Sequence, residues 1–420
     1  MKISIDKSIA NGIVTAPPSK SMAHRLIICA ALCDGVSIIE NVDYSQDIEA
    51  TIDCIRTLGA KVVTDESTVT VDGRDTVIRT LTSDNNMSDK ADISELVFNC
   101  RESGSTMRFF MGIAMTLPCV SVFNGSETLR NRPFGIYEKI LNDEATSLAN
   151  DKTFFERKPD KIVIKGAVKG NEFEVAGNIS SQFITGLLLA MSIKGEGGRI
   201  NLIPPVESRS YIDMTLQALA EFGVKASWQD ENTLIVANGS NFKSKNLRVE
   251  GDYSNAAFLD AFNYLGGSVE VNGLNEKSLQ GDRVYKEYFD ELSKGKATLD
   301  IADCPDLGPV LFAVAAANHG GLFTSTARLK IKESDRGSVM CEELAKFGVK
   351  TRMEENSIEI DGGGLKIPSE ILCGHNDHRI VMSLSLLLTQ TGGIINDAEA
   401  VRKSYPGFFD DIAKLGVIVE

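Results

Sequence analysis

Cationic and hydroxyl side chains gather in one short stretch near the start of the chain. Residues 18–25 read PSKSMAHR and place Lys20, Ser21, His24 and Arg25 beside the apolar run LIICAALCDG. The run predicts a buried helix, and a helix N-terminus offers unpaired N–H groups and the positive end of a dipole. Arg adds a planar fork for carboxylate or phosphate, and Lys adds a mobile point charge. The stretch therefore predicts a site for an anion.

Similar groups stand near other apolar runs, in RESGSTMRFF, GNISSQF, CPDLGP and GHNDHRIVM, and between runs in LRNRPFG, KIKESDRG and RKSYPG. One such cluster alone is usually a helix cap with a solvated Arg, and KESDR alone also fits a salt-bridged surface turn. Independent caps need not all carry phosphate-binding groups, so the set predicts one cationic site built from several helix N-termini. Its members are Gly104, Ser105, Arg108, Arg132, Ser180, Ser181, Gln182, Asp306, Lys332, Glu333, Arg336, Asp377, His378, Arg379 and Lys403.

The elements that must position these groups recur along the chain. Six times a polar cluster is followed by an apolar helical run, a short β-type run and a second, amphipathic helix. Four of the second helices close on nearly the same phrase, in RTLGAKV, AEFGVKA, AKFGVKT and AKLGVIV. We expect the first helices to begin at Ser21, Ser105, Ser181, Ser254, Asp306 and Asp377, and Gly59, Gly223, Gly348 and Gly416 to take the left-handed position after the second helices.

The two kinds of helix predict an α/β fold with an unusual interior. The first helix of each repeat is almost entirely apolar, so it should be buried on every side, whereas the second has a polar face and should lie outside. Six repeats suggest two domains of three repeats each. The chain contains neither a GxGxxG after a strand nor a GxxxxGKS, so the sequence does not support a nucleotide-binding sheet.

Composition limits the possible partners. The formal net charge of −14 opposes binding to nucleic acid or to an anionic membrane surface, so cations for an anion must be concentrated locally. No apolar run approaches the ~18 residues that span a bilayer, and the start MKISIDKSIANG lacks an apolar core, so we expect a cytoplasmic protein. Eight cysteines without a CxxC pair and four histidines without HExxH predict neither a disulfide framework nor a metal site.

Nine segments in one order resemble the 5-enolpyruvylshikimate-3-phosphate synthase family: PSKSMAHR, SGSTMR, LRNRP, SSQFITGLLLA, VESRSYIDMT, PDLGPV, IKESDR, NDHRIVM and RKSYPGFF. The resemblance runs essentially from end to end. It implies a two-domain inside-out α/β barrel, each domain with three βαβαββ-type units, and an active site in the interdomain cleft. The implied domains are residues 18–248, and residues 1–17 together with 249–420.

The resemblance also implies a reaction and its ligands. Such enzymes move the enolpyruvyl group of phosphoenolpyruvate onto the 5-hydroxyl of shikimate 3-phosphate and release phosphate, with no metal or organic cofactor. Both substrates are small polyanions, and we expect a monomer without further partners. Residues implied to bind shikimate 3-phosphate are Lys20, Ser21, Arg25, Ser180, Ser181, Gln182, Ser208, Tyr211, Asp306 and Lys332. Residues implied to bind phosphoenolpyruvate are Lys20, Gly104, Arg132, Gln182, Arg336, Arg379 and Lys403.

Three residues are nominated for the chemistry on the same basis. Asp306 would take the proton of the 5-hydroxyl, and Glu333 or Lys20 would protonate the methylene to give a tetrahedral intermediate that loses phosphate. His378 could share this work, and the assignment of each proton stays open. Arg108 is expected to support its loop rather than to touch a ligand.

The chain departs from the family pattern at some positions. Arg328 stands where Asn is common, four residues before the Lys of KESDR, and Phe109 follows Arg108 where Pro or Leu is common. The loop Glu102-Ser103-Gly104-Ser105 replaces Asn-Ala/Ser-Gly-Thr but keeps Gly104, where a Cβ would intrude on the phosphoenolpyruvate pocket. We therefore predict sensitivity to glyphosate, which fills that pocket in sensitive members.

Two alternative functions fit the sequence less well. The related transferase acting on UDP-N-acetylglucosamine has Lys-Asn near its start and a loop Cys as acid, whereas here Ser21 follows Lys20 and residues 104–135 hold only Cys119, in a β-type run. A non-catalytic anion-binding protein would be expected to lose its acid–base groups first. All four such groups are present here: Asp306, Glu333, Lys20 and His378.

Overall fold

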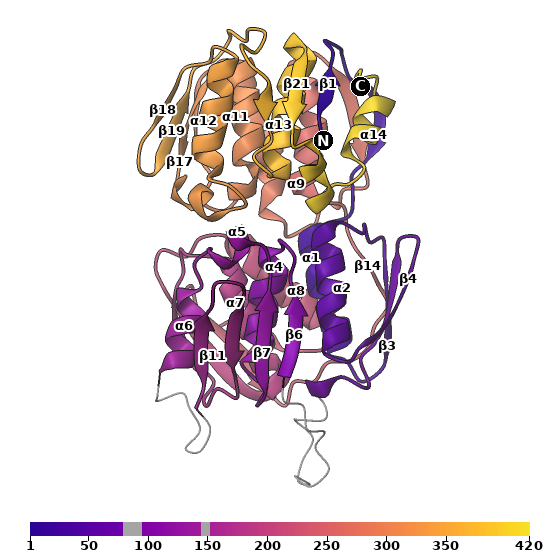
Figure 1. Ribbon diagram of the computed structural model, residues 1–420, viewed down its shortest axis with the longest axis vertical. Coiled ribbons are helices and arrows are strands. Elements are labelled where there is room, and N and C mark those ends of the chain that lie inside the picture. The colour runs from indigo at the N-terminus through magenta and orange to yellow at the C-terminus, as the bar shows by residue number, and fades with distance from the viewer. Residues whose placement is uncertain (79–94, 144–151) are drawn as a thin grey trace. The chain divides into compact units, whose positions relative to one another are not determined.

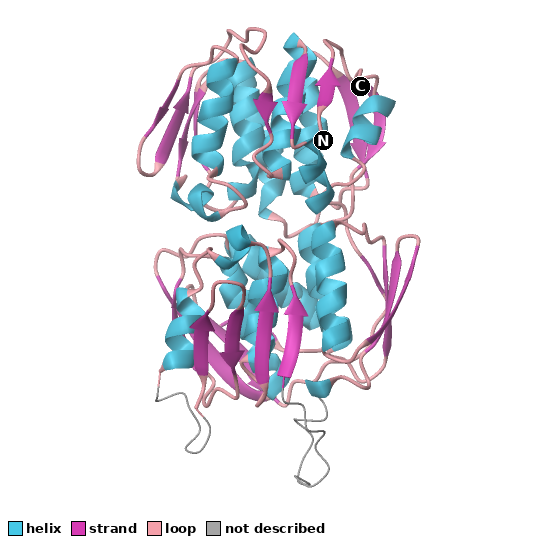
Figure 2. Cartoon of the chain, in the orientation of Figure 1, coloured by secondary structure: helices cyan, strands magenta, loops and turns pink. Residues whose placement is uncertain are grey.

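The structure is a computed structural model that describes residues 1–78, 95–143 and 152–420. Contacts divide it into two compact units, each with its own hydrophobic core. We call Lys20–Val249 the central unit, and Met1–Ser19 together with Glu250–Glu420 the terminal unit. Both units are mixtures of helices and sheets, in which helices gather in the middle and strands lie around them (Figures 1 and 2).

The central unit contains three four-stranded sheets with one shared pattern. In each sheet the first pair of strands is parallel and the other two pairs are antiparallel, in the orders β14-β3-β5-β4, β6-β7-β9-β8 and β10-β11-β13-β12. The strands are β3 Val36–Glu40, β4 Lys61–Asp65, β5 Thr68–Asp72, β6 Glu95–Asn99, β7 Val120–Asn124, β8 Phe154–Arg157, β9 Ile162–Lys165, β10 Glu172–Ala176, β11 Glu196–Ile203, β12 Ala226–Trp228, β13 Thr233–Asn238 and β14 Leu247–Arg248. The helices are α1 Lys20–Ala31, α2 Gln46–Thr57, α4 Gly104–Ala114, α5 Glu127–Arg130, α6 Gly135–Asn142, α7 Ser181–Lys194 and α8 Arg209–Glu221.

The terminal unit repeats the same sheet once in full, as β16-β17-β19-β18, and adds the smaller sheets β1-β21-β20 and β15-β2. Its strands are β1 Ile3–Ile5, β2 Asn11–Thr15, β15 Ser268–Asn272, β16 Ala297–Asp300, β17 Gly321–Thr324, β18 Thr351–Met353, β19 Ser357–Ile360, β20 Leu372–Cys373 and β21 Gly393–Asn396. Its α-helices are α9 Tyr253–Asp260, α10 Tyr285–Lys294, α11 Gly308–Ala317, α12 Arg336–Lys346, α13 His378–Thr391 and α14 Phe408–Lys414. Short 3-10 helices are η2 Ala261–Leu265, η3 Gly281–Val284, η4 Pro305–Leu307, η5 Ala327–Ile331 and η6 Ala398–Lys403.

The predicted burial of the first helix in each repeat is confirmed. Every residue of α1 from Met22 to Ala31 is buried, and so is every residue of α11 from Gly308 to Ala316. In the central unit the backbones of α4 and α7 pack against each other at Gly112 and Gly186. The approach is so close that a Cβ on Gly112 would lie only 2.3 Å from the carbonyl oxygen of Gly186. The repeated βαβαββ order with buried helices confirms the predicted fold class. None of the helices in the described residues combines the length and the apolar character needed to cross a bilayer.

The predicted helix ends are confirmed, and the predicted starts differ from the observed ones by two positions at most. Gly59, Gly223, Gly348 and Gly416 all have positive φ angles, between 78° and 95°, just after second helices. Helix α7 begins at Ser181 as predicted and Asp377 caps α13, whereas α4 begins one residue early, after its cap Ser103, and α9 one residue early, after its cap Asp252. Helix α1 begins at Lys20, and Asp306 lies in η4 before α11. Adjacent polar residues compete for a cap, and only the backbone conformation decides which oxygen reaches the free N–H groups.

Candidate active site

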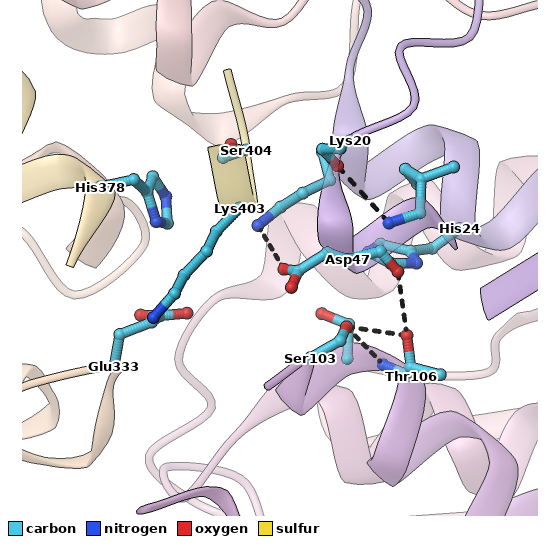
Figure 3. A network of polar contacts seen from close by, with 12 residues as sticks. Lys20, His24, Asp47, Ser103, Thr106, Glu333, His378, Lys403 and Ser404 are labelled. Atoms are coloured by element: carbon cyan, nitrogen blue, oxygen red, sulfur yellow. Dashed lines mark hydrogen bonds and ion pairs between the residues drawn. The ribbon is translucent and has the colours of Figure 1, made fainter. Parts of the chain in front are cut away.

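Lys20 begins α1 in the central unit and pairs with a carboxylate from the next helix. Its Nζ lies 2.8 Å from Oδ2 of Asp47, in the first turn of α2, and both side chains are largely buried. Figure 3 shows this contact beside the N-terminal turn of α4. The carboxylate holds the ammonium group in one place, which favours its use as a fixed cation.

Arg25 lies one turn further along α1 and makes three hydrogen bonds of 3.0 Å or less. Its Nη1 donates to the carbonyl of Ser21 at 2.6 Å, its Nε to Oγ1 of Thr215 at 2.9 Å, and its Nη2 to the carbonyl of Tyr211 at 3.0 Å. Burial lowers the pKa of Arg25 to about 10, so the guanidinium stays charged at neutral pH. The structure thus brings together three residues predicted to bind shikimate 3-phosphate: Ser21, Arg25 and Tyr211.

Gly104 is the first residue of α4 and lies against two guanidinium groups. A Cβ at this position would be 2.7 Å from Nη1 of Arg132 and 3.0 Å from Nη1 of Arg108. Arg108 donates to Oε1 of Gln182 at 2.5 Å, and Gln182 Nε2 donates to Oγ of Ser105 at 2.9 Å. Five predicted residues therefore form one cluster, and the contact of Arg108 with Gln182 fits its predicted supporting role.

The remaining predicted residues of the central unit lie at the starts of α7 and α8. Ser180 caps α7 with an extended backbone, and its Oγ accepts from the N–H of Gln182 at 3.3 Å, while Ser181 is the first helical residue. Ser208 precedes α8 in the left-handed region, with φ 54°. Such a conformation is uncommon for a residue other than glycine and often marks a functional position.

Asp306 is the centre of an ion-pair cluster in the terminal unit. Its carboxylate lies 2.8 Å from Arg336 Nη1, 3.0 Å from Lys332 Nζ and 3.3 Å from Arg379 Nη2. Burial acts to raise the pKa of the Asp306 carboxyl, but the charges of Arg379, Lys332 and Arg336 outweigh burial and hold this pKa well below its usual range. Asp306 is therefore ionised at neutral pH, as a general base must be before it accepts a proton.

Arg336 links three carboxylates. It is almost fully buried at the start of α12, and it donates through Nε to Asp377 at 2.8 Å, through Nη2 to Glu333 at 2.6 Å and through Nη1 to Asp306. Burial alone would lower the pKa of Arg336, but the carboxylates of Asp377, Glu333 and Asp306 raise it. The cluster thus joins five predicted site residues: Asp306, Lys332, Glu333, Arg336 and Arg379.

Lys403 and Arg328 stand near this cluster in the same unit. Lys403 Nζ donates at 2.6 Å to the carbonyl of Asn376, directly before the Asp377 cap. His378 is buried at the start of α13. Arg328, at a position where the family often has Asn, is buried in η5. Burial of the Lys332 ammonium lowers its pKa, and the nearby charge of Arg328 lowers this pKa further.

The sequence motifs do not point to Asp47, and they give no sign that Asp377 pairs with Arg336. An acid in the first turn of a helix usually complements the helix dipole, so Asp47 in SQDIE gave no sign of its pairing with Lys20. The predicted single site in a cleft between domains stays a prediction.

One group among the described residues has ligand atoms spaced for a metal ion: Glu342, Glu343 and His375, within 4.8 Å of one another. Glu343 already accepts from Lys346 Nζ at 2.8 Å and from the N–H of Cys373 at 3.1 Å, and His375 Nε2 lies 2.9 Å away. The arrangement therefore fits a buried ion-pair network that fixes the turn before Asp377.

Comparisons with known proteins identify the family of the chain. The model of the EPSP synthase (3-phosphoshikimate 1-carboxyvinyltransferase) family matches residues 6–412. A 3-phosphoshikimate 1-carboxyvinyltransferase of Clostridium beijerinckii is 37% identical, covering 98% of this chain and 96% of its own, and one of Clostridioides difficile is 35% identical, covering 99% and 97%. An EPSP synthase structure from Acinetobacter baumannii shares the fold, with TM-score 0.75, 23% identity and coverage of 100% and 99%. The chain belongs to the EPSP synthase (3-phosphoshikimate 1-carboxyvinyltransferase) family.

Proposed function

We propose that this chain transfers the enolpyruvyl group of phosphoenolpyruvate to the 5-hydroxyl of shikimate 3-phosphate and releases phosphate, a step toward chorismate and the aromatic amino acids. Family membership over nearly the whole chain supports the reaction. The observation that carries the chemistry is Asp306, a carboxylate kept ionised by three cations. We also expect the enzyme to be a cytoplasmic monomer that needs no metal or organic cofactor.

The residue roles follow from the chemistry of the two steps. Asp306 removes the proton of the 5-hydroxyl as its oxygen bonds to C2 of phosphoenolpyruvate, and Glu333 or Lys20 delivers a proton to the methylene carbon. The tetrahedral intermediate then breaks its bond to the phosphate oxygen and loses a methyl proton, which restores the vinyl group. In the central unit, Arg25 with Ser21, Ser180, Ser181, Ser208 and Tyr211 would hold shikimate 3-phosphate.

Phosphoenolpyruvate, the second anionic substrate, would bind through arginine guanidinium groups and lysine ammonium groups. Arg132 beside Gly104 would hold phosphoenolpyruvate in the central unit, and Arg336, Arg379 and Lys403 would hold it in the terminal unit. In the structure Arg336 and Arg379 pair with Asp306. The Asp306 carboxylate thus pairs with the guanidinium groups that the carboxylate or phosphate of phosphoenolpyruvate would contact.

The test is phosphate release by the purified protein with phosphoenolpyruvate and one of two acceptors. We expect release only with shikimate 3-phosphate, because phosphate is the leaving group after addition of its 5-hydroxyl. Release only with UDP-N-acetylglucosamine would identify the sugar-nucleotide transferase instead. Absence of release with both acceptors, from folded protein that still binds both anions, would favour the non-catalytic alternative.

The substitution Gly104→Ala should weaken phosphoenolpyruvate binding selectively. Its Cβ would displace the guanidinium groups of Arg132 and Arg108, which lie 2.7 and 3.0 Å from that position. We expect KM for phosphoenolpyruvate to rise about tenfold, equal to ~1.4 kcal/mol, while KM for shikimate 3-phosphate stays within about twofold. Glyphosate, which we predict to inhibit the unchanged enzyme, should lose potency in the same variant.

Gly135→Ala is the matched control for this experiment. Gly135 begins α6 in the same unit, and a Cβ there would meet no atom within 4 Å. Steady-state kinetics with each substrate varied in turn should leave this variant unchanged. An unaltered KM for phosphoenolpyruvate in Gly104→Ala would show that the site lies elsewhere.

A further inference from the structure

A chain of buried hydrogen bonds lies behind the N-terminal turns of α1 and α4. Nδ1 of His24 is 2.7 Å from Oγ1 of Thr51, which is 2.7 Å from Oγ1 of Thr106. Oγ1 of Thr106 is in turn 2.7 Å from Oγ of Ser103. All four residues are fully buried, and the reaction chemistry gives none of them a role. Burial of a hydroxyl group costs desolvation free energy, so a chain of buried, hydrogen-bonded hydroxyl groups indicates a specific role.

The chain ends at Ser103 and Asp47, which support two residues predicted to bind phosphoenolpyruvate, Gly104 and Lys20. Ser103 caps α4, so its position fixes the turn that contains Gly104. Oγ1 of Thr106 also lies 3.4 Å from the carbonyl oxygen of Asp47, whose carboxylate holds Lys20. Figure 3 shows Thr106 joined to Asp47 and to Ser103. One hydroxyl therefore connects the Gly104 turn to the support of Lys20.

His24 closes the chain without adding charge. Burial, followed by the nearby charges of Lys20 and Arg25, holds the pKa of His24 well below 6.5, so its ring is neutral at neutral pH. The ring meets Phe109 edge to face, with centroids 6.4 Å apart. His24 thus acts as a fixed hydrogen-bonding end rather than as one of the cations for the substrates.

A separate pair of hydroxyls serves the neighbouring residue of α1. Oγ1 of Thr215 accepts from Nε of Arg25 at 2.9 Å and lies 2.7 Å from Oγ1 of Thr185. Both threonines are buried, on α8 and α7. No hydrogen bond recorded among the described residues joins this pair to the chain of Thr51 and Thr106, and the pair supports a residue assigned to shikimate 3-phosphate.

We propose that Thr51 and Thr106 are positioning residues for the phosphoenolpyruvate half of the site, and that Thr185 and Thr215 position Arg25 for shikimate 3-phosphate. The inference rests on the proposed function. Its physical basis is that catalytic and binding groups must be held within a fraction of an ångström, and that fixed hydrogen bonds behind them supply this precision.

The decisive variant is Thr106→Val, which removes the hydroxyl and keeps the branched shape. We expect KM for phosphoenolpyruvate to rise about tenfold, because both ends of the chain serve this ligand, and KM for shikimate 3-phosphate to rise by less, because only the Lys20 end serves it. Thr106→Ser restores Oγ and should recover most of the affinity. Thr215→Val is the matched control and should show the opposite pattern, with KM raised for shikimate 3-phosphate.

Thr51→Val interrupts the same chain one step further from the ligands, so it should change the two KM values in the same direction as Thr106→Val but by less. If Thr106→Val does not fold, Thr51→Val provides the test. Equal rises in both KM values, or a lower Tm with neither KM changed, would overturn the proposal. If the unchanged enzyme releases no phosphate, the proposed function fails. Calorimetric titration with phosphoenolpyruvate then tests the positioning role, which is refuted if Thr106→Val binds as tightly as the unchanged chain.

Discussion

The variant Asp306→Asn should lose turnover while it still binds both substrates. Asn keeps the shape of the side chain but cannot accept a proton, and a general base typically contributes about 10²- to 10⁴-fold to the rate. We therefore expect kcat to fall by roughly that factor. The surrounding cations, Lys332, Arg336 and Arg379, remain in place, and loss of the carboxylate leaves them free to pair with anionic ligands. Neither KM should rise.

Asp303→Asn makes the same chemical change three residues away, at an exposed position before η4. Its kcat should stay within about twofold of the unchanged enzyme, since general-base catalysis requires contact with the transferred proton. Rapid-quench measurement of a single turnover would separate the chemical step from product release. A near-normal rate for Asp306→Asn would remove Asp306 from the role of base and turn attention to Glu333 and His378.

The variant Arg336→Met should destabilise the terminal unit strongly. Arg336 is almost fully buried and neutralises Asp377, which is also fully buried, together with Asp306 and Glu333. Removal of one partner from a buried ion pair costs about 3–5 kcal/mol, because a charge is left without compensation. At roughly 2–4 °C per kcal/mol for a unit of this size, the melting temperature should fall by about 6–20 °C.

Arg352→Met provides the comparison within the same unit. Arg352 lies 2.8 Å from Glu354, but both side chains are mostly exposed to solvent. An exposed pair contributes about 0–1 kcal/mol, so the melting temperature should change by no more than about 4 °C. Differential scanning calorimetry of both variants tests the contrast. Equal shifts would mean that the cluster around Arg336 contributes no more than a surface pair.

The repeat and its buried helices could be predicted because they depend on local signals. The apolar faces of α1 and α11 and the glycine after each second helix, such as Gly59, follow from hydrophobic periodicity and backbone sterics. The starts could not be fixed, since Ser103 and Ser105 differ only in the backbone conformation that tertiary packing selects. Three sheets of one pattern in the central unit show that the repeat extends to strand pairing, which the sequence did not reveal.

The candidate site was predictable in its residue types but not in its pairings. Lys20, Asp306 and Arg336 stand in motifs at helix starts, so their sequence neighbours identify them. Asp47 pairs with Lys20 across 27 positions and Thr106 bonds to Thr51 across 55, and neither contact has a local signature. Such contacts depend on how whole helices pack, and they are the ones that hold the predicted cations in place.

The most direct test of the central claim is identification of the product by proton and phosphorus NMR in deuterium oxide, with phosphoenolpyruvate and shikimate 3-phosphate as substrates. Transfer through a tetrahedral intermediate predicts an enol ether at the 5-oxygen of shikimate 3-phosphate, an equal amount of inorganic phosphate, and deuterium in the vinyl group, because the methylene carbon is protonated from the solvent and then deprotonated. Phosphate without an enol ether, or an enol ether with no deuterium, would contradict transfer by addition and elimination.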